Sequence, residues 1–440
     1  MEQRAGKSIA RELFSFSLPL ILSGVLQQLY NWADAFIVGH VEGELAMGAI
    51  GATTAAVNLF ITAMTGFTLG LNVLMAQLHG AGEDSRLAGM LRAFAAILLA
   101  VFAAIALPGV FLAGELLELL DTTPDMLPLS TAYLSVIFLG LPFLGVYNVY
   151  SAALRALGDS RAPFLAVAVS SAVNVALDIL LVAVIPLGVR GAAIATVFSQ
   201  AAMTVFIVAY AVKKHPPLRY KLRLRGMMGG GMVREGVRFG LPPMIQSSIT
   251  AVGSLFLQSY MNSFGDDTVT AITTAYRVDT IILLPIVNLG SAVATLTAQS
   301  LGARDGGRAK RILRVGLAMM AAVSLTLTLI IIPTGGALIA MFGAGGAVVA
   351  IGRRFFACIA PFYVVIGLST AVRGHLEGRG DMVCSSAVGI TALAVRIALS
   401  YALRGVFGNM TIAYAEAFSW ALMLCLYLLR LLWLRRRRGY

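Results

Sequence analysis

Charge is what this sequence has least of: only 12% of its 440 residues are Asp, Glu, Lys or Arg, whereas 59% are hydrophobic. Soluble domains carry about twice that share of charged residues, so the composition excludes an ordinary soluble fold. The apolar residues form repeated stretches of the length that crosses a bilayer, about 20 residues each. We therefore expect a polytopic membrane protein with little chain left for a soluble domain.

The sequence also lacks the groupings that mark metal centres and hydrolytic enzymes. Its three cysteines, Cys358, Cys384 and Cys425, lie in apolar stretches without CxxC spacing, as small core residues do. It contains no HExxH, GxSxG or P-loop motif and no pair of histidines at metal-ligand spacing. The residues therefore give no support to a membrane-embedded enzyme, and we expect neither an enzyme nor a resident cofactor.

The net charge of +12 could indicate a nucleic-acid partner, but the placement of the cations argues against one. Most Lys and Arg residues lie at the two termini and in alternate connections, while intervening connections carry acids such as Glu42 and Glu115. By the positive-inside rule the basic set is cytoplasmic. We expect a multi-pass protein of the cell (inner) membrane with both termini cytoplasmic. Residues 435–438 would anchor it at anionic headgroups or form a solvated tail. The basic connections are residues 86–92, 155–161, 213–238, 304–314 and 373–379.

The apolar runs between these connections predict twelve membrane spans. Helices are the economical choice, because a backbone in lipid must satisfy its own hydrogen bonds and the runs lack the alternation of barrel strands. The first six lie near residues 13–38, 47–77, 92–112, 130–153, 163–187 and 191–212. The second six lie near residues 237–262, 268–298, 312–333, 353–373, 383–403 and 411–434.

The two halves of the chain repeat at an offset of about 222 residues. Because six is an even number, both halves enter the membrane in the same direction, and a cavity is expected between them. The predicted fold is all-α, with twelve transmembrane helices in two pseudo-symmetric six-helix lobes, 1–212 and 237–440, joined by a cytoplasmic linker at 213–236. The matching positions are Leu18-Pro19 with Leu241-Pro242, Ala76-Gln77 with Ala298-Gln299, Gly80-Ala81 with Gly302-Ala303, Arg86 with Arg308, Arg92 with Arg314, and Gly158-Asp159 with Gly380-Asp381.

Acidic residues inside the predicted spans are the main functional candidates, since an ionised carboxylate at membrane depth costs several kcal/mol unless it is paired or protonated. Asp178 lies four residues after Asn174, hence on the same helical face. Gln27, Asn31 and Asp34 form a polar stripe on the first span, as expected for a helix that lines a water-filled cavity. The alternative for each is a hydrogen-bonded polar residue without function near a helix end.

Comparison of the two halves shows that these acids are not part of the repeated pattern. At the same offset Asp34 falls on Leu257 or a neighbour, Asn174 falls on Arg396, and Asp178 falls on Ser400. The acids therefore belong to the first lobe alone, which suggests that one lobe carries a coupling ion.

The second lobe has polar residues of its own. Arg396 could form a neutralising ion pair with Glu416 or Asp279, whereas Arg277 lies two residues from Asp279 and does not share its helical face. The sequence leaves the roles of Arg277, Asp279, Arg396 and Glu416 open.

Three segments resemble the MATE (multidrug and toxic compound extrusion) efflux transporters. Residues 31–40, NWADAFIVGH, resemble the first-span acid motif of that family, and residues 154–160, LRALGDS, resemble its cytoplasmic motif after the fourth span. Residues 174–200, NVALDILLVAVIPLGVRGAAIATVFSQ, are similar to its fifth and sixth spans. The resemblance covers essentially the whole chain.

The resemblance implies a cation site in the first lobe, in which Asp34, Asn174, Asp178 and Thr196 match the family's carboxylate, amide, carboxylate and hydroxyl positions. These groups would bind H+ or Na+ in exchange for an organic, often cationic, substrate, and Na+ would be held by Asp34, Asn174 and Asp178. The resemblance also implies a monomer.

One departure from the family pattern concerns the subtype. The NorM-type branch carries acids on its seventh and tenth spans, and here residues 237–262 and 353–373 contain none. The sequence therefore favours the DinF-type arrangement.

Function is predicted to be secondary active multidrug efflux by alternating access. The substrate would bind in the interlobe cavity among polar, apolar and Met side chains suited to amphipathic cations, although each polar residue could simply pack between helices. The predicted substrate-binding residues are Gln27, Asn31, Tyr147, Asn148, Gln258 and Asn262.

Two alternatives remain open at this point. A lipid-linked oligosaccharide flippase of the same superfamily would be favoured if Arg277 and Arg396 faced the cavity. A transport-inactive scaffold would be favoured if Asp34 and Asp178 were solvated and far apart. The sequence does not reveal the substrate, the choice between H+ and Na+, or the stoichiometry.

Overall fold

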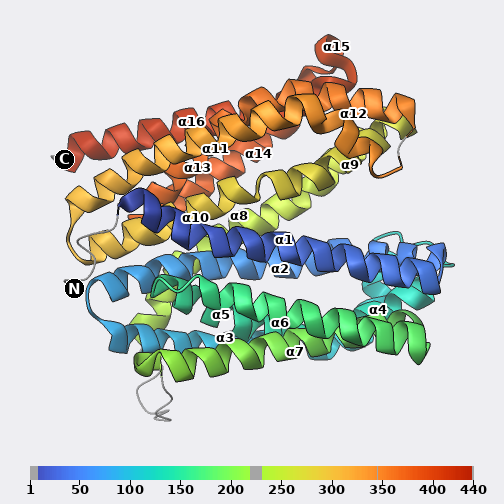
Figure 1. Cartoon of the computed structure of the whole chain (residues 1–440), viewed down its shortest axis with the longest axis horizontal. Coiled ribbons are helices and arrows are strands. Elements are labelled where there is room, and N and C mark those ends of the chain that lie inside the picture. The colour runs from blue at the N-terminus through green and yellow to red at the C-terminus, as the bar shows by residue number, and fades with distance from the viewer. Residues whose placement is uncertain (1–7, 219–229, 344, 439–440) are drawn as a thin grey trace. The chain divides into compact units, whose positions relative to one another are not determined.

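The computed structural model describes residues 8–218, 230–343 and 345–438, and every secondary-structure element in these ranges is helical (Figure 1). Part of the predicted linker, residues 219–229, lies outside the described residues, as do the N-terminal Arg4 and Lys7. The first half contains α1 (Ile9–Val41), α2 (Glu44–Gly80), α3 (Asp84–Leu119), α4 (Leu127–Phe138), α5 (Leu141–Ala156), α6 (Arg161–Asp178), the π-helix η2 (Ile179–Val184), α7 (Gly188–Lys214) and the short 3-10 helix η3 (Pro216–Leu218).

The second half follows the same order. It contains α8 (Gly230–Asn262), α9 (Asp266–Ile282), α10 (Leu284–Gly302), α11 (Gly306–Ala340), α12 (Gly346–Ile359), the 3-10 helix η4 (Ala360–Phe362), α13 (Tyr363–Gly378), α14 (Met382–Ala402), α15 (Arg404–Phe407), the 3-10 helix η5 (Gly408–Met410) and α16 (Thr411–Arg438).

Helices occupy all twelve positions at which spans were predicted. Most extend beyond the predicted limits, but the fifth ends at Val184 instead of residue 187 and the eleventh ends at Ala402 instead of residue 403. Within the described ranges, nine helices are long and apolar enough to cross a membrane, and eleven if each of two bent pairs is one span. The helix α8 has 33 residues but is not among them, since its middle is interrupted by Gln246, Ser247 and Ser248. The chain is therefore a multi-pass helical membrane protein, and the count of twelve spans stays a prediction.

Two spans are bent because proline interrupts their hydrogen bonding. The axes of α4 and α5 differ by 45°, and those of α9 and α10 by 41°. Pro142 and Pro285 each stand in the first turn of the second helix, where the missing N–H breaks the bond to the preceding helix. The corresponding stretch of α2 has Ala63 instead of a proline and continues without a break.

Packing divides the described chain into two compact units. The N-terminal unit is Leu22–Gly240, and the C-terminal unit consists of the residues up to Ile21 together with those from Leu241 on. This division differs from the predicted lobes at two places. The start of α1 belongs to the C-terminal unit, and the start of α8 belongs to the N-terminal unit. Both boundaries lie beside prolines, Pro19 in α1 and Pro242 in α8.

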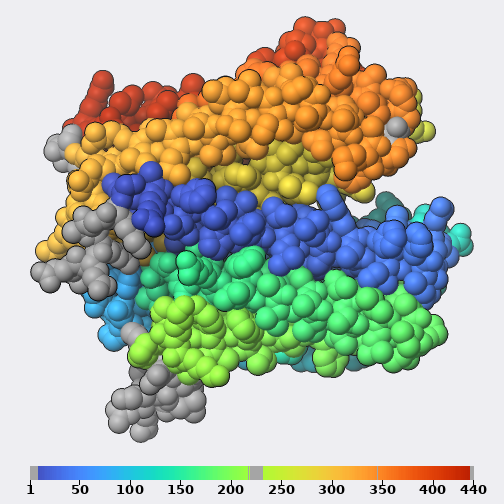
Figure 2. Space-filling model, viewed as in Figure 1, coloured from blue at the N-terminus to red at the C-terminus, as the bar shows by residue number. Residues whose placement is uncertain are grey.

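The start of α1 packs within the C-terminal unit. Leu13, Phe16 and Leu20 share one buried core with residues of α10, α11 and α13, and the dark blue start of α1 borders the yellow-orange atoms of these helices (Figure 2). The carboxylate of Glu12 accepts a hydrogen bond of 2.7 Å from Nη2 of Arg308 in a largely buried ion pair.

The start of α8 packs within the N-terminal unit in the corresponding way. A Cβ atom at Gly236 would lie 2.2 Å from the Phe94 ring, and one at Gly70 of α2 would lie 2.1 Å from the backbone oxygen of Phe239. These helices can approach so closely only because both positions are glycine. Glu235 forms an exposed ion pair of 3.3 Å with Arg86, the repeat counterpart of Arg308.

The repeated Gly-Asp turn ends a helix in each half. Gly158 and Gly380 have φ angles of +86° and +83°, which non-glycine residues rarely adopt. Oδ1 of Asp159 accepts hydrogen bonds of 3.2 Å from the first two backbone N–H groups of α6, while Asp381 accepts 2.8 and 3.2 Å bonds from Arg430. The repeated Gly-Asp pair therefore has a structural role in both halves.

Candidate functional site

Two polar residues of the candidate site lie at the end of α6. Asn174 and Asp178 are 1% and 0% exposed, on one face of the helix as their spacing predicts. Directly after Asp178 the helix widens into η2, where the N–H of Ile185 bonds to the carbonyl of Leu180 at 2.9 Å. Such π-type turns occur frequently at functional sites. Gly188, with φ +61°, then lets the chain reverse into α7.

The structure brings Asp34 of α1 to this pair. Asp34 is half-buried, and its carboxyl group is near enough to interact directly with that of Asp178. Neither oxygen of Asp178 has a hydrogen-bond donor among the described residues, and the same holds for Oδ1 of Asp34 and Oδ1 of Asn174, while Nδ2 of Asn174 has no acceptor there. The site is therefore a buried group of oxygen atoms that the surrounding side chains leave unsatisfied.

Thr196 of α7 joins the site through a residue that the sequence analysis missed. The Tyr133 side chain on α4 is buried, and its hydroxyl interacts with the side chain of Thr196 and with the charges of Asp34 and Asp178. No local spacing links Tyr133 to these residues, because they lie on four different helices. Its only signal was a tyrosine in an apolar run, which generally needs a polar partner when buried.

Glycines bring the backbone of α7 close to its neighbours. A Cβ atom at Gly191 would lie 2.6 Å from the carbonyl oxygen of Leu181 in η2, and one at Gly140 would lie 2.1 Å from Oε1 of Gln200. Gln200 stands one helical turn after Thr196, and its Oε1 also lacks a hydrogen-bond partner in the described chain. These glycines therefore let α7 lie close to η2 and Gln200 lie close to the start of α5.

The chemistry of the cluster follows from its oxygen atoms. Two carboxylates can share a hydrogen bond only if one of them carries a proton, and otherwise their negative charges repel each other. Carboxylate, amide and hydroxyl oxygens are also the ligands that small hard cations prefer. No group of three or more His, Cys, Asp or Glu side chains in the described ranges could hold a metal ion. The oxygen atoms of the cluster have the chemistry to hold a proton or a small hard cation.

The predicted substrate-binding residues fall into two sets, one in each unit. In the N-terminal unit Gln27 and Asn31 are exposed, while Tyr147 and Asn148 are half-buried on α5. Tyr30 links the two helices, since it interacts with Gln27 and with Tyr147. Asn148 is already used in packing: its amide donates to the carbonyl of Leu144 at 2.9 Å. In the C-terminal unit, Gln258 donates to Asn262 at 3.2 Å on the exposed face of α8.

Charges in the C-terminal unit are paired, in contrast to those around Asp178. Nη2 of Arg396 donates to Oε2 of Glu416 at 2.7 Å and to the hydroxyl of Tyr276 at 2.9 Å. The Tyr276 hydroxyl donates in turn to Glu416 at 3.1 Å. The predicted ion pair of Arg396 with Glu416 is therefore confirmed.

Asp279 has a partner as well. It is 4% exposed and accepts a short hydrogen bond from the hydroxyl of Tyr363. Arg277 is exposed, which confirms that it does not share a face with Asp279. Since Glu416 neutralises Arg396, the geometry gives no support to a pyrophosphate site built from Arg277 and Arg396.

Comparisons with known proteins agree with this architecture. The family model MatE matches residues 19–180 and again residues 242–402, so one model fits each half and begins at Pro19 and Pro242, the positions that the repeat aligns. Probable multidrug resistance protein YpnP of Bacillus subtilis (strain 168) is 29% identical over 85% of this chain and 84% of its own.

Two further matches cover nearly the whole chain. Multidrug export protein MepA of Staphylococcus saprophyticus is 23% identical over 96% of this chain and 94% of its own. The structure described as the outward-facing conformation of a multidrug resistance MATE family transporter of the MOP superfamily has a TM-score of 0.88, at 19% identity, over 98% of this chain and 96% of that one.

Proposed function

The chain belongs to the MatE family of multidrug efflux transporters, and from that premise we propose that it exports organic, often cationic, compounds in exchange for H+ or Na+ by alternating access. The coupling ion binds in the N-terminal unit at Asp34, Asn174, Asp178 and Thr196. The observation that carries this proposal is the contact between two carboxyl groups whose buried oxygens have no donors among the described residues.

Exchange follows from the charge of this pair. Without a bound cation, two adjacent carboxylates are an unfavourable arrangement in a poorly solvated site. Uptake of a proton or a sodium ion neutralises one negative charge and favours the conformation in which the pair is close together. Because a ligand shifts a conformational equilibrium only by its differential affinity, such a site can couple ion binding to a change of access.

The available energy sets the scale of transport. One elementary charge that moves across 100 mV releases about 2.3 kcal/mol, which supports a substrate gradient of about 50-fold. A chemical gradient of the ion adds to this value.

The coupling site is assigned to the N-terminal unit, in the DinF-type arrangement. The seventh and tenth predicted spans have no carboxylate, and the buried acids of the C-terminal unit already have Arg396 and tyrosine hydroxyls as partners. We further propose that the protein acts as a monomer in the cell membrane with both termini in the cytoplasm.

A liposome assay tests the proposal. The purified full-length chain is reconstituted, and transport of a fluorescent organic cation is measured under a proton gradient alone and under a sodium gradient alone. Asp178→Asn keeps the shape of the side chain but cannot exchange its charge, so gradient-driven transport should fall to the level of protein-free liposomes.

Asp279→Asn is the matched control, because it makes the same change at a buried aspartate of the C-terminal unit. It should keep at least about half of the wild-type rate, since an amide oxygen still accepts the hydrogen bond of Tyr363. Undiminished transport by Asp178→Asn would overturn the site assignment. Transport under neither gradient, together with movement of a lipid-linked sugar, would replace the antiport mechanism with a flippase.

A further inference from the structure

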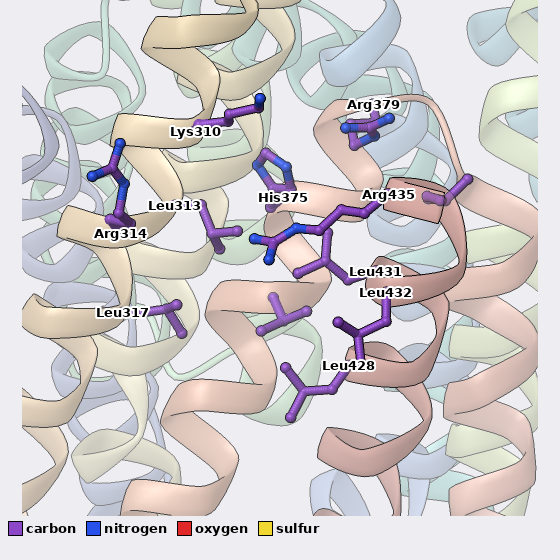
Figure 3. Close-up of a pocket in the computed structure, with 12 residues that line it drawn as sticks. Lys310, Leu313, Arg314, Leu317, His375, Arg379, Leu428, Leu431, Leu432 and Arg435 are labelled. Carbon is purple, nitrogen blue, oxygen red and sulfur yellow. The ribbon is translucent and has the colours of Figure 1, made fainter. Parts of the chain in front are cut away.

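A cavity of about 410 Å³ lies between α11, α13 and α16 in the C-terminal unit, far along the chain from the acid cluster (Figure 3). Its size is within the range of about 300–1,000 Å³ that is usual for small-molecule sites. One part of its lining is basic, the rest is aliphatic, and none of the described lining residues is acidic. The lining is Lys310, Leu313, Arg314, Leu317, Val372, His375, Arg379, Leu428, Leu431, Leu432, Leu434 and Arg435.

The basic residues converge on one end of the cavity. Figure 3 shows Lys310, His375 and Arg435 around this end, with the Arg435 side chain extending from α16 toward His375. Arg379 and Arg435 are near enough for their charges to act on the imidazole. His375 is only 3% exposed, and its Nδ1 lies 3.5 Å from Oγ1 of Thr297.

The other end of the cavity is a wall of leucines. Leu317 of α11 and Leu428 of α16 lie there, away from the basic end (Figure 3). Between the two ends, Leu313 and Leu431 belong to a continuous apolar core that also contains Val372. An occupant must therefore offer an anionic group at one end and a hydrocarbon surface at the other.

The repeat shows that the fold does not require these cations. At the offset of the two halves, Lys310 corresponds to Ala88 and His375 to Ala153, while Arg379 corresponds to Leu157. Ala88 of α3 and Ala153 of α5 are both buried in the N-terminal unit. Lys310, His375 and Arg379 are thus additions of the second half, as the unsatisfied acids are additions of the first, whereas Arg314 and Arg435 correspond to the basic Arg92 and Lys213.

We propose that this cavity binds an anionic phospholipid, with the phosphate among Lys310, His375 and Arg435 and an acyl chain against the leucine wall. The basic connections that surround it are those that the positive-inside rule assigns to the cytoplasmic side, where anionic lipids give the leaflet its negative surface potential. A basic pocket between membrane helices at that depth is a recognised type of headgroup site. The site is independent of the proposed coupling ion.

Lipid titration of the purified full-length protein in detergent tests this proposal. Phosphatidylglycerol should raise the unfolding temperature of the wild type, whereas phosphatidylcholine with the same acyl chains should have much less effect. In Lys310→Ala/Arg435→Ala the apparent affinity for phosphatidylglycerol should fall at least about tenfold. Arg311→Ala/Arg436→Ala is the control with the same loss of charge, because both residues are exposed neighbours outside the lining; it should bind like the wild type.

A second variant keeps the test valid if the first folds poorly. Lys310→Ala/His375→Ala/Arg379→Leu installs the residues that the first half carries at these positions, so its packing has a precedent in the same fold, and it too should lose selective binding. If Arg311→Ala/Arg436→Ala loses as much affinity for phosphatidylglycerol, the effect comes from general surface charge, and the proposed site is wrong. Equal stabilisation by phosphatidylcholine, or by inorganic phosphate alone, would overturn the assignment to an anionic lipid.

Discussion

The two units treat their buried carboxylates in opposite ways. In the N-terminal unit Asp34 and Asp178 interact with each other, and their buried oxygens have no donors among the described residues. In the C-terminal unit Glu416 is bound by Arg396 at 2.7 Å, and Asp279 accepts a hydrogen bond from a tyrosine hydroxyl. A buried acid with partners is satisfied within the fold, whereas an acid without partners requires something from outside the chain. The difference supports the proposal that the N-terminal unit carries the coupling ion.

Acids that occur in both halves sharpen this distinction. Asp159 and Asp381 are repeat counterparts, and so are Glu12 and Glu235; each forms hydrogen bonds or an ion pair with its own unit. Repetition of an acid therefore coincides with a structural role. The unsatisfied pair at Asp34 and Asp178 has no repeat counterpart, which is expected of residues kept for a function of one unit alone.

The largest predicted effect comes from removing a partner in the C-terminal unit. Arg396→Met leaves the buried charge of Glu416 without compensation, and we expect the free energy of unfolding to fall by about 3–5 kcal/mol. Thermal unfolding in detergent measures the loss. The double variant Arg396→Met/Glu416→Met should recover most of it, since apolar residues of similar volume replace buried ion pairs at little cost. If the single variant is as stable as the wild type, the pair is not a structural element.

Thermal unfolding should show the opposite change in stability for a variant in the N-terminal unit. Asp178→Asn removes one of two adjacent carboxylates, and we expect stability at neutral pH without sodium to rise by about 1–3 kcal/mol. Functional sites often carry such a cost in stability. A loss of stability comparable with that of Arg396→Met would show that Asp178 is a structural residue, and the comparison between the two units would fail.

Asp159 gives a smaller effect with a defined pH dependence. Burial raises the pKa of its carboxyl group, but hydrogen bonds from His215 and Tyr210 and the charge of Lys214 outweigh burial and lower the pKa from 3.8 to about 2. A lowered pKa means that the native state favours the ionised form, so its contribution is complete above about pH 4 and is lost as the pH falls through 2.

We expect Asp159→Asn to destabilise the protein by about 1–2 kcal/mol at neutral pH. The amide oxygen can still accept the backbone N–H bonds at the start of α6, so the variant removes the charge together with the hydrogen bonds that Oδ2 accepts from Tyr210 and His215. Unfolding temperatures of both proteins between pH 7 and pH 2 should converge at the acidic end. A difference that is independent of pH would contradict the electrostatic origin.

Much of the architecture could be predicted because its causes are local. The length of the apolar runs and the alternation of basic and acidic connections located the helices, and the pairing of Asn174 with Asp178 followed from the period of one helix. Pro285 is a local signal for the bend between α9 and α10, although only the structure shows that the corresponding α2 remains straight.

Other features depend on contacts between segments that are distant in sequence. Tyr133 reaches Thr196 and the two aspartates from a fourth helix, so no spacing pattern contains it. The start of α8 packs closely at Gly70 and Gly236, and η2 after Asp178 lies close against Gly191. Sequence patterns constrain a helix and its faces, but these features arise from how the helices meet.

The smallest predicted effect compares the two exchanged helix starts. Glu12 and Arg308 form a 2.7 Å pair with side chains 15% and 19% exposed, whereas Glu235 and Arg86 are 39% and 51% exposed at 3.3 Å. Exposed pairs contribute about 0–1 kcal/mol because solvent screens them, so Glu12→Gln should destabilise the protein by about 1 kcal/mol more than Glu235→Gln. Added salt should reduce the effect of Glu235→Gln first, since screening acts mainly on exposed charges. Equal losses in the two variants, with equal salt dependence, would mean that burial does not distinguish these pairs and that the two helix starts are energetically equivalent.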